Sequence, residues 1–201
     1  MTTVSTTKDI LFIQTGGTID KEYPKTIGGY SFEIGDPAIE RVVGRVKPSV
    51  GFSYTTVTIC QKDSQEILQR DREVLAKCIG ESIQKKIIVT HGTDTIIETA
   101  LFVQNHLSKT LTGNNKNVIF VGSFIPEKFK DSDADINIGA ALGALDVLGM
   151  LRDDKSDKPD DSRCVYISLG GRVIPADKAV RNTITGLFCH CDEIDISGEV
   201  K

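Results

Sequence analysis

A hydroxyl and a carboxylate stand side by side at Thr93-Asp94, directly after an apolar run over residues 86–90. A helical pattern follows at once, which predicts a strand, a tight loop and a helix. Ligands bind at the carboxyl ends of strands in open α/β sheets, where helix N-termini also meet. Asp94 could bind a cationic amino group there while the Thr93 hydroxyl receives or relays a proton. Asp94 could equally be a plain helix N-cap.

A second polar turn, Thr15-Gly16-Gly17-Thr18, follows the short apolar run over residues 10–14. The glycines let the backbone approach a ligand closely, and the Thr15 hydroxyl is expected at the mouth of the sheet. The turn lacks the lysine of a phosphate-binding loop and the three spaced glycines of a dinucleotide fingerprint. A purely structural turn explains the glycines equally well.

The elements that must position these turns alternate along the chain. Strands are expected at residues 10–14, 54–60, 86–90, 117–122 and 163–168, and helices at 36–48, 71–86, 96–107 and 136–151. This alternation predicts an α/β fold, a three-layer α/β/α sandwich with a mainly parallel sheet. Asp36 is the expected N-cap of the first helix, with Pro37 at its first position. The glycine-rich segment 21–35 is too long for a simple connection and is typical of a lid.

Composition limits the class of protein. The 201 residues are 39% hydrophobic and 26% charged, which suits one globular domain over residues 1–201. A net charge of -4 does not attract nucleic acid or an anionic membrane electrostatically, so a small-molecule partner is expected. The N-terminus lacks a signal-peptide pattern, and no apolar run is expected to approach a membrane span. The odd number of cysteines, five, favours reduced thiols and a cytoplasmic protein.

The two turns together resemble the bacterial-type L-asparaginase family, through Thr15-Gly-Gly-Thr and His91-Gly-Thr-Asp-Thr. The resemblance extends over roughly residues 10–182, through Asp63-Ser64-Gln65, Val121-Gly122-Ser123, Ser132-Asp133-Ala134 and Asn137. It implies the fold of the asparaginase N-terminal domain. It also implies a cofactor-independent amidohydrolase that splits the side-chain amide of asparagine into aspartate and ammonia.

By the same resemblance, Thr15 is the nucleophile, and a lid tyrosine, either Tyr23 or Tyr30, polarises its hydroxyl. Thr93, Asp94 and a downstream lysine form the family's second cluster, and Ser64 and Asp94 hold the carboxylate and amino ends of the substrate. The substrate-binding set implied in this way comprises Gly16, Asp63, Ser64, Gln65, Gly92, Thr93 and Asp94.

The chain departs from the family pattern at the lysine. Alignment puts Arg181 at that place, and Lys178 lies three residues earlier. Arginine stays protonated, so it could hold Thr93 and Asp94 electrostatically but could not shuttle a proton. Lys178 could supply the proton transfer instead, or the second cluster works differently.

The chain is also short for the family. In length it resembles single-domain members, which lack the smaller C-terminal domain of full-sized members. The expectation is a more open site, weaker substrate binding and a homo-oligomer. Rival functions are an ammonia-supplying subunit of a tRNA-dependent amidotransferase and a non-catalytic asparagine or aspartate sensor. No metal site is expected, because neighbouring residues of Cys189-His190-Cys191 point to opposite faces of a strand.

Overall fold

Six strands form one sheet in the computed structural model, which describes residues 9–26, 28–29, 31–46, 51–109, 115–153 and 164–193. Their spatial order is β4-β1-β5-β6-β7-β8. The strands are β1 (Ile10–Gly16), β4 (Tyr54–Lys62), β5 (Lys86–Thr90), β6 (Asn117–Val121), β7 (Val165–Leu169) and β8 (Arg172–Pro175). All neighbours pair in parallel except β7 and β8, which are antiparallel. The mainly parallel sheet is therefore confirmed.

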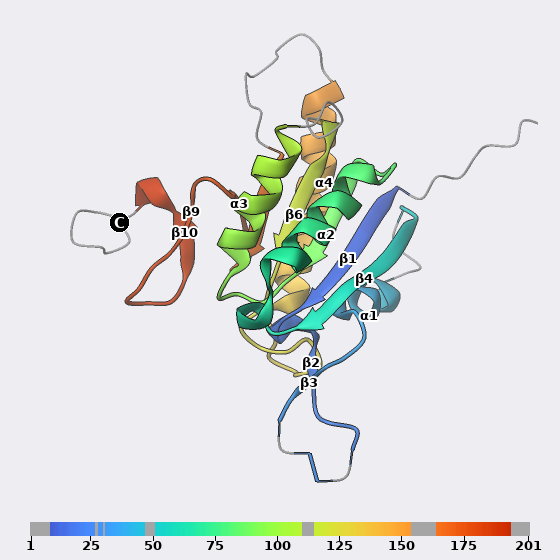
Figure 1. The fold of residues 1–201 in the computed structure, drawn as a ribbon, viewed down its shortest axis with the longest axis vertical. Coiled ribbons are helices and arrows are strands. Elements are labelled where there is room, and N and C mark those ends of the chain that lie inside the picture. Colours follow the sequence, from blue (N-terminus) through green and yellow to red (C-terminus); the bar gives the residue numbers. More distant parts are fainter. Residues whose placement is uncertain are drawn as a thin grey trace, which may run out of the picture.

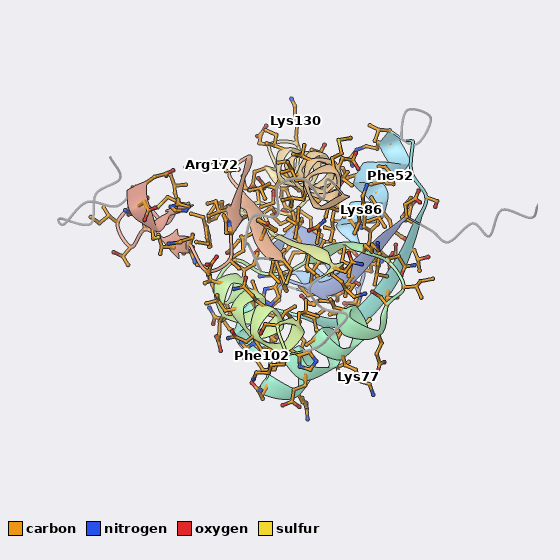
Figure 2. The ribbon with its side chains drawn as sticks, turned by 90° about the horizontal axis from the view of Figure 1, so that it is seen from above. Phe52, Lys77, Lys86, Phe102, Lys130 and Arg172 are labelled. Carbon is orange, nitrogen blue, oxygen red and sulfur yellow. The ribbon has the colours of Figure 1, made fainter. Side chains whose placement is uncertain are left out.

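Four helices cover the two faces of this sheet (Figure 1). They are α1 (Ala38–Arg45), α2 (Gln69–Glu81), α3 (Ile96–Leu107) and α4 (Ala134–Asp153). One buried cluster joins α2 and α3 to one face, and a second joins α1 and α4 to the other. Figure 2 shows the layers from above, with Lys77 on α2 and Phe102 on α3 on one side of the sheet. The predicted three-layer sandwich is confirmed.

The start of α1 differs from the prediction. The N-cap is Pro37, not Asp36, and the helix begins at Ala38 without a cap from its own segment. The Ala38 NH instead donates to the Asp20 carboxylate at 2.7 Å. A free NH at a helix N-terminus needs an acceptor, and here a residue eighteen positions earlier supplies it.

Short strands beyond the parallel core were not predicted. In the lid segment, β2 (Lys21–Glu22) pairs antiparallel with β3 (Glu33–Ile34). The Gly170-Gly171 turn, with both φ angles positive, reverses the chain into β8. A separate hairpin then joins β9 (Ala179–Arg181) to β10 (Phe188–His190). This hairpin carries Arg181 toward the ends of the parallel strands.

Helix α4 corrects one expectation. Over Ala134–Leu151 it is long and apolar enough, by length and composition, to cross a membrane. Its buried stripe packs against the sheet through Ala134, Ile138, Ala141 and Leu145. The helix itself was expected, at residues 136–151, but this hydropathy was not. An amphipathic core helix satisfies the same length and composition criteria.

Candidate active site

The ends of three neighbouring strands touch through glycines. Gly17 follows β1 with a φ of 87°, and a Cβ atom on it would lie 2.1 Å from the Gly92 nitrogen. A Cβ atom on Gly92 would in turn lie 2.8 Å from the hydroxyl oxygen of Ser64, which follows β4. Only glycine fits at Gly17, because both the φ angle and the space exclude a side chain. The turns therefore form one site at the carboxyl edge of the sheet.

Thr15 lies in β1 at this edge and is 2% exposed. Its hydroxyl donates to the Thr90 carbonyl oxygen at 2.7 Å, and the Thr90 hydroxyl donates to the Asp20 carboxylate at 3.0 Å. Thr15 is thus held at the end of a short polar chain that runs from β1 through β5 to Asp20.

Asp20 is a buried carboxyl group that the sequence interpretation did not select. It is fully buried, and burial raises its pKa from 3.8 to about 6. The hydrogen bonds from Ala38 and Thr90 act in the opposite direction. The only available signal in the sequence was an acidic residue two positions after Thr18, at the end of a glycine turn.

The base of the lid is fastened around Asp20. The Gly35 NH donates to the Asp20 carbonyl oxygen at 2.8 Å. The Gly35 carbonyl oxygen accepts from the side-chain amides of Gln14 at 2.8 Å and Gln61 at 2.9 Å. Both ends of the segment between residues 20 and 38 are therefore tied to the strands beneath them.

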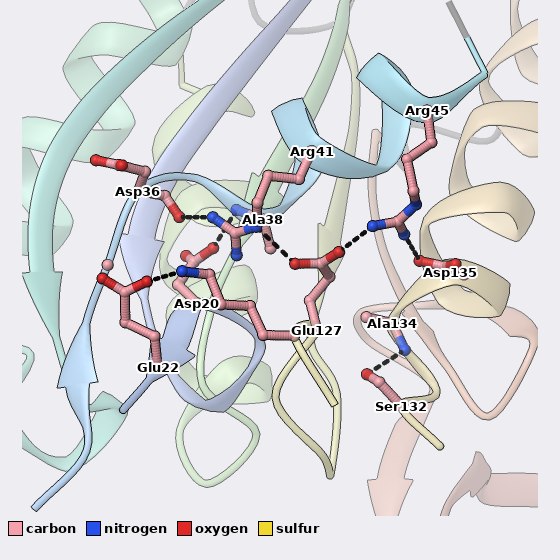
Figure 3. Close-up of polar contacts among 12 residues, drawn as sticks. Asp20, Glu22, Asp36, Ala38, Arg41, Arg45, Glu127, Ser132, Ala134 and Asp135 are labelled. Carbon is pink, nitrogen blue, oxygen red and sulfur yellow. Dashed lines mark hydrogen bonds and ion pairs between the residues drawn. The ribbon is translucent and has the colours of Figure 1, made fainter. Parts of the chain in front are cut away.

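A network of ion pairs ties α1 to the loop after β6 (Figure 3). The buried Glu127 carboxylate contacts Arg41, with 2.6 Å between Nε and Oε2, and it also contacts Arg45. Although burial opposes ionisation, the two guanidinium groups hold the pKa of Glu127 below its usual range. In the same region, Glu22 on β2 pairs with Lys128. These pairs support the lid and loop on one side of the site.

The Asp94 carboxylate is held by two side chains. Its Oδ2 accepts from the Gln65 amide at 2.7 Å, and its Oδ1 lies 2.8 Å from the Arg181 guanidinium. These two hydrogen bonds, that of Gln65 first, lower the pKa of Asp94. The N-cap interpretation of Asp94 is wrong, since Thr95 is the N-cap of α3 and its hydroxyl donates to the Ser64 carbonyl oxygen at 2.8 Å.

Of the two candidate cations, Arg181 and not Lys178 contacts Asp94 within the described residues. Lys178 lies in the turn before β9, half-buried, and its backbone NH donates to the Pro175 carbonyl oxygen. The two residues differ in position, because Arg181 lies at the end of the short β9, whereas Lys178 lies in the turn before this strand.

The remaining predicted binding residues cluster around these turns. Ser64 is 2% exposed, and the methyl group of Thr93 would lie 3.2 Å from a Cβ atom on Gly122. Asp63 pairs with Lys21, with 2.6 Å between Oδ2 and Nζ, and this contact lowers the pKa of Asp63. The structure thus brings together Gly16, Asp63, Ser64, Gln65, Gly92, Thr93 and Asp94 at the ends of β1, β4 and β5.

Of the two candidate lid tyrosines, the structure describes Tyr23, which contacts other aromatic rings. Tyr23 is 70% exposed, and its ring packs against Phe32 and Phe129 with centroid distances of 5.3 and 5.7 Å. Tyr30 lies outside the described residues.

His91 is a buried neutral residue beneath the site. Its Nδ1 lies 2.8 Å from the Gly92 carbonyl oxygen, which can only accept, so Nδ1 carries the proton. Its Nε2 has no hydrogen-bond partner in the part of the chain that the structure describes. Burial lowers the pKa of His91 from 6.5 to about 4. This histidine therefore supports the turn as an uncharged group.

The other residues that carried the resemblance brace the loop after β6. The buried Asn137 side chain donates to the Gly122 carbonyl oxygen and to Asp133, both at 2.9 Å. The Asp133 carboxylate also accepts from the Phe124 NH at 3.0 Å. Phe124 lies against Arg181, so this brace contributes indirectly to the position of the cation.

At the end of β10, strand alternation separates Cys189 from His190, but His190 and Cys191 do not point to opposite faces as expected, because Cys191 lies in a 3-10 helical turn after the strand. Cys189 is buried, whereas the ligand atoms of His190, Cys191 and Asp192 lie within 4.8 Å of one another on the surface. The three are consecutive and contact one another through Asp192, which takes part in hydrogen bonds with His190 and Cys191.

Comparison with known proteins agrees with this geometry. A glutaminase-asparaginase of Acinetobacter glutaminasificans is 24% identical over 67% of this chain and 40% of its own length. An L-asparaginase of Thermococcus kodakarensis is 30% identical over 66% of this chain and 39% of its own length. The crystal structure of a probable cytoplasmic L-asparaginase from Campylobacter jejuni superposes with a TM-score of 0.68 at 22% identity, covering 96% of this chain and 57% of that one.

The chain therefore spans about half the length of these relatives, or less. Residues 9–183 match the family Asparaginase, N-terminal, which is most of the chain. The strand order, the two glycine turns and this match agree. The chain belongs to the asparaginase family, in the region of its N-terminal domain.

Proposed function

We propose that the protein hydrolyses the side-chain amide of L-asparagine to L-aspartate and ammonia, with Thr15 as the nucleophile. The observation that carries the proposal is the contact of the Thr15 turn with the Thr93-Asp94 turn, through Gly17 and Gly92. A hydroxyl and a second hydroxyl-carboxylate pair thereby meet at one edge of the sheet, where ligands of α/β folds bind. Family membership supports amide hydrolysis as the chemistry.

The proposed reaction has two steps. The Thr15 Oγ1 attacks the amide carbon, the carbon-nitrogen bond breaks, and the hydroxyl proton passes through a general base to the leaving nitrogen, which departs as ammonia. Water then attacks the resulting ester, releases aspartate and returns a proton to Thr15. The hydroxyl must first leave the Thr90 carbonyl, to which it donates at 2.7 Å. The NH groups of Gly17 and His91 already donate to backbone carbonyls, so other groups must stabilise the oxyanion.

In this proposal a lid tyrosine accepts the Thr15 proton, and Thr93 assists from the second turn. Tyr23 can take that role only after its ring leaves Phe32 and Phe129. Arg181 is a permanent cation, so it orients Asp94 and does not transfer a proton. Lys178 is assigned no role beside Asp94, and if Tyr23 is not the base, Tyr30 takes its place.

The test is ammonia release by the purified protein from asparagine, glutamine and related amides, followed with a coupled assay. Release from asparagine that disappears in Thr15→Ala and Thr93→Ala, with circular dichroism unchanged, is the expected result. Full activity in either variant would remove that residue from the mechanism. Tight aspartate binding without any ammonia release would replace the hydrolase proposal with a sensor.

We also propose a cytoplasmic homo-oligomer. Cys60, Cys78, Cys189 and Cys191 are free thiols, which suits a reducing compartment. Helix α4 leaves Ile136, Val147, Met150 and Leu151 exposed on its outer side, an apolar surface of the kind that subunits cover. Light scattering on the purified protein measures the number of subunits, and cell fractionation shows in which compartment the protein lies. A monomer, or protein recovered outside the cytoplasm, would overturn the corresponding part.

A further inference from the structure

Asp94 offers no unpaired oxygen to a ligand in this structure. One carboxylate oxygen lies 2.8 Å from the Arg181 guanidinium, and the other accepts from the Gln65 amide at 2.7 Å. A substrate ammonium that approached this carboxylate would meet a negative charge that a cation already compensates.

Arg181 is fixed independently of Asp94. Its Nε donates to the Gly186 carbonyl oxygen at 3.1 Å, within the hairpin that carries it. Its guanidinium also lies over the rings of Phe124 and Phe188, at 5.9 and 5.6 Å from their centroids. Cation–π contacts with two rings and a hydrogen bond to the backbone hold the cation in place, and a guanidinium does not lose its proton at any working pH. Displacing it to admit an ammonium would sacrifice all of these contacts.

The neighbouring carboxylate is compensated as well. Asp63 pairs with Lys21, with 2.6 Å between Oδ2 and Nζ, and the Lys21 charge also acts on Asp94. The four charges thus form one cluster, in which two carboxylates face two cations. Both carboxylates of this cluster, Asp63 and Asp94, therefore already face a cation.

Building on the proposed amide hydrolysis, we propose that Arg181 determines specificity by excluding a free α-ammonium group. The preferred substrates are then amides of dicarboxylic acids that lack this group, such as succinamate, in preference to asparagine. The carboxylate end of such a substrate gains from the nearby cations, whereas the α-ammonium of asparagine is repelled by Arg181.

Binding of the two acid products isolates the effect, because succinate and aspartate differ only in the amino group. Isothermal titration calorimetry should give a Kd for succinate about fivefold lower than for aspartate, the effect of one partly exposed charge contact. Arg181→Gln, which removes the charge, should make the two Kd values equal or reverse their order. Arg181→Lys should retain part of the preference for succinate. The matched control Arg172→Gln, which breaks a surface pair with Glu193, should leave the ratio unchanged.

Activity then separates this inference from the hydrolase proposal itself. The kcat/KM for ammonia release should be higher with succinamate than with asparagine, and Arg181→Gln should shift the preference toward asparagine. Aspartate binding as tightly as succinate, or a ratio insensitive to Arg181→Gln, would overturn the specificity inference even with amide hydrolysis intact. Absence of binding by both acids would overturn it too. A succinate preference without ammonia release from either amide would refute the hydrolase proposal alone.

Discussion

Replacing Asp20 with asparagine changes the charge at the base of the lid while keeping its shape. The asparagine oxygen can still accept from the Ala38 NH, and its amide can donate to the Thr90 hydroxyl, which rotates to accept. Because this hydroxyl oxygen remains bonded, the Thr90 carbonyl that holds Thr15 stays in place. Asp20→Asn is therefore expected to fold and to remove one titrating group from the interior.

The sign of the effect follows from the raised pKa of Asp20. Burial raises this pKa from 3.8 in the unfolded chain to about 6 in the folded protein. Between these two values the folded state binds a proton that the unfolded state has lost, so stability falls as pH rises from about 4 to about 6. Above that window, the charged carboxylate lowers the free energy of unfolding by about 3 kcal/mol relative to acid conditions.

Urea denaturation of both proteins from pH 4 to pH 8 measures this linkage. The free energy of unfolding of Asp20→Asn minus that of the wild type should rise by about 3 kcal/mol across the window. His91 has a pKa lowered to about 4 by burial, so its own contribution falls as pH decreases from 6.5, but it is common to both proteins and cancels. Asp36→Asn, at an exposed carboxylate of the same segment, is the matched control.

A difference that stays constant from pH 4 to pH 8 would refute the reasoning, because Asp20 would then titrate alike in the folded and unfolded chain. A difference that falls with rising pH would mean that Asp20 is stabilised as an anion. In that case the hydrogen bonds from Ala38 and Thr90 would outweigh its burial.

Three further changes test the site. Gly17→Ala should destabilise the fold by about 1–3 kcal/mol or more and abolish ammonia release, because the added Cβ atom would overlap the Gly92 backbone. Thermal unfolding measures the loss of stability. Gly28→Ala is the control for backbone strain alone, because Gly28 has a similar φ but open space around it. Tyr23→Phe and Tyr30→Phe should differ in kcat. The variant that lacks the proton acceptor should have a kcat about a hundredfold lower. Equal kcat in both would remove the lid tyrosine from the mechanism. Arg181→Gln should shift the succinate-to-aspartate binding ratio, as calorimetry would show.

Much of the fold follows from local patterns. The apolar runs that became β1, β5 and β6 are short, β-branched and bounded by glycine or polar turns, and the helices between them repeat apolar residues at helical spacing. Because parallel strands end at the same edge of a sheet, the polar turns after them could be expected to meet. The close approach of Gly17 to Gly92 confirms that expectation.

These local patterns could not predict contacts between residues far apart in the sequence. The cap of α1 comes from Asp20, and local sequence favours Asp36 because capping preferences describe neighbouring residues only. The hairpin that carries Arg181 is formed by three-residue strands, too short to show an alternating pattern. Alignment selected Arg181 by position, but the contacts with Phe124 and Phe188 that fix it depend on tertiary structure.

The central claim is that Thr15 attacks the amide and forms an ester with the substrate. Acid quenching of the protein during turnover of asparagine or succinamate, followed by peptide mass spectrometry, tests it most directly. The account predicts an acyl adduct on the peptide that contains Thr15, absent in Thr15→Ala. An adduct on the Thr93 peptide, or ammonia release with no adduct on Thr15 under conditions that trap esters, would contradict it.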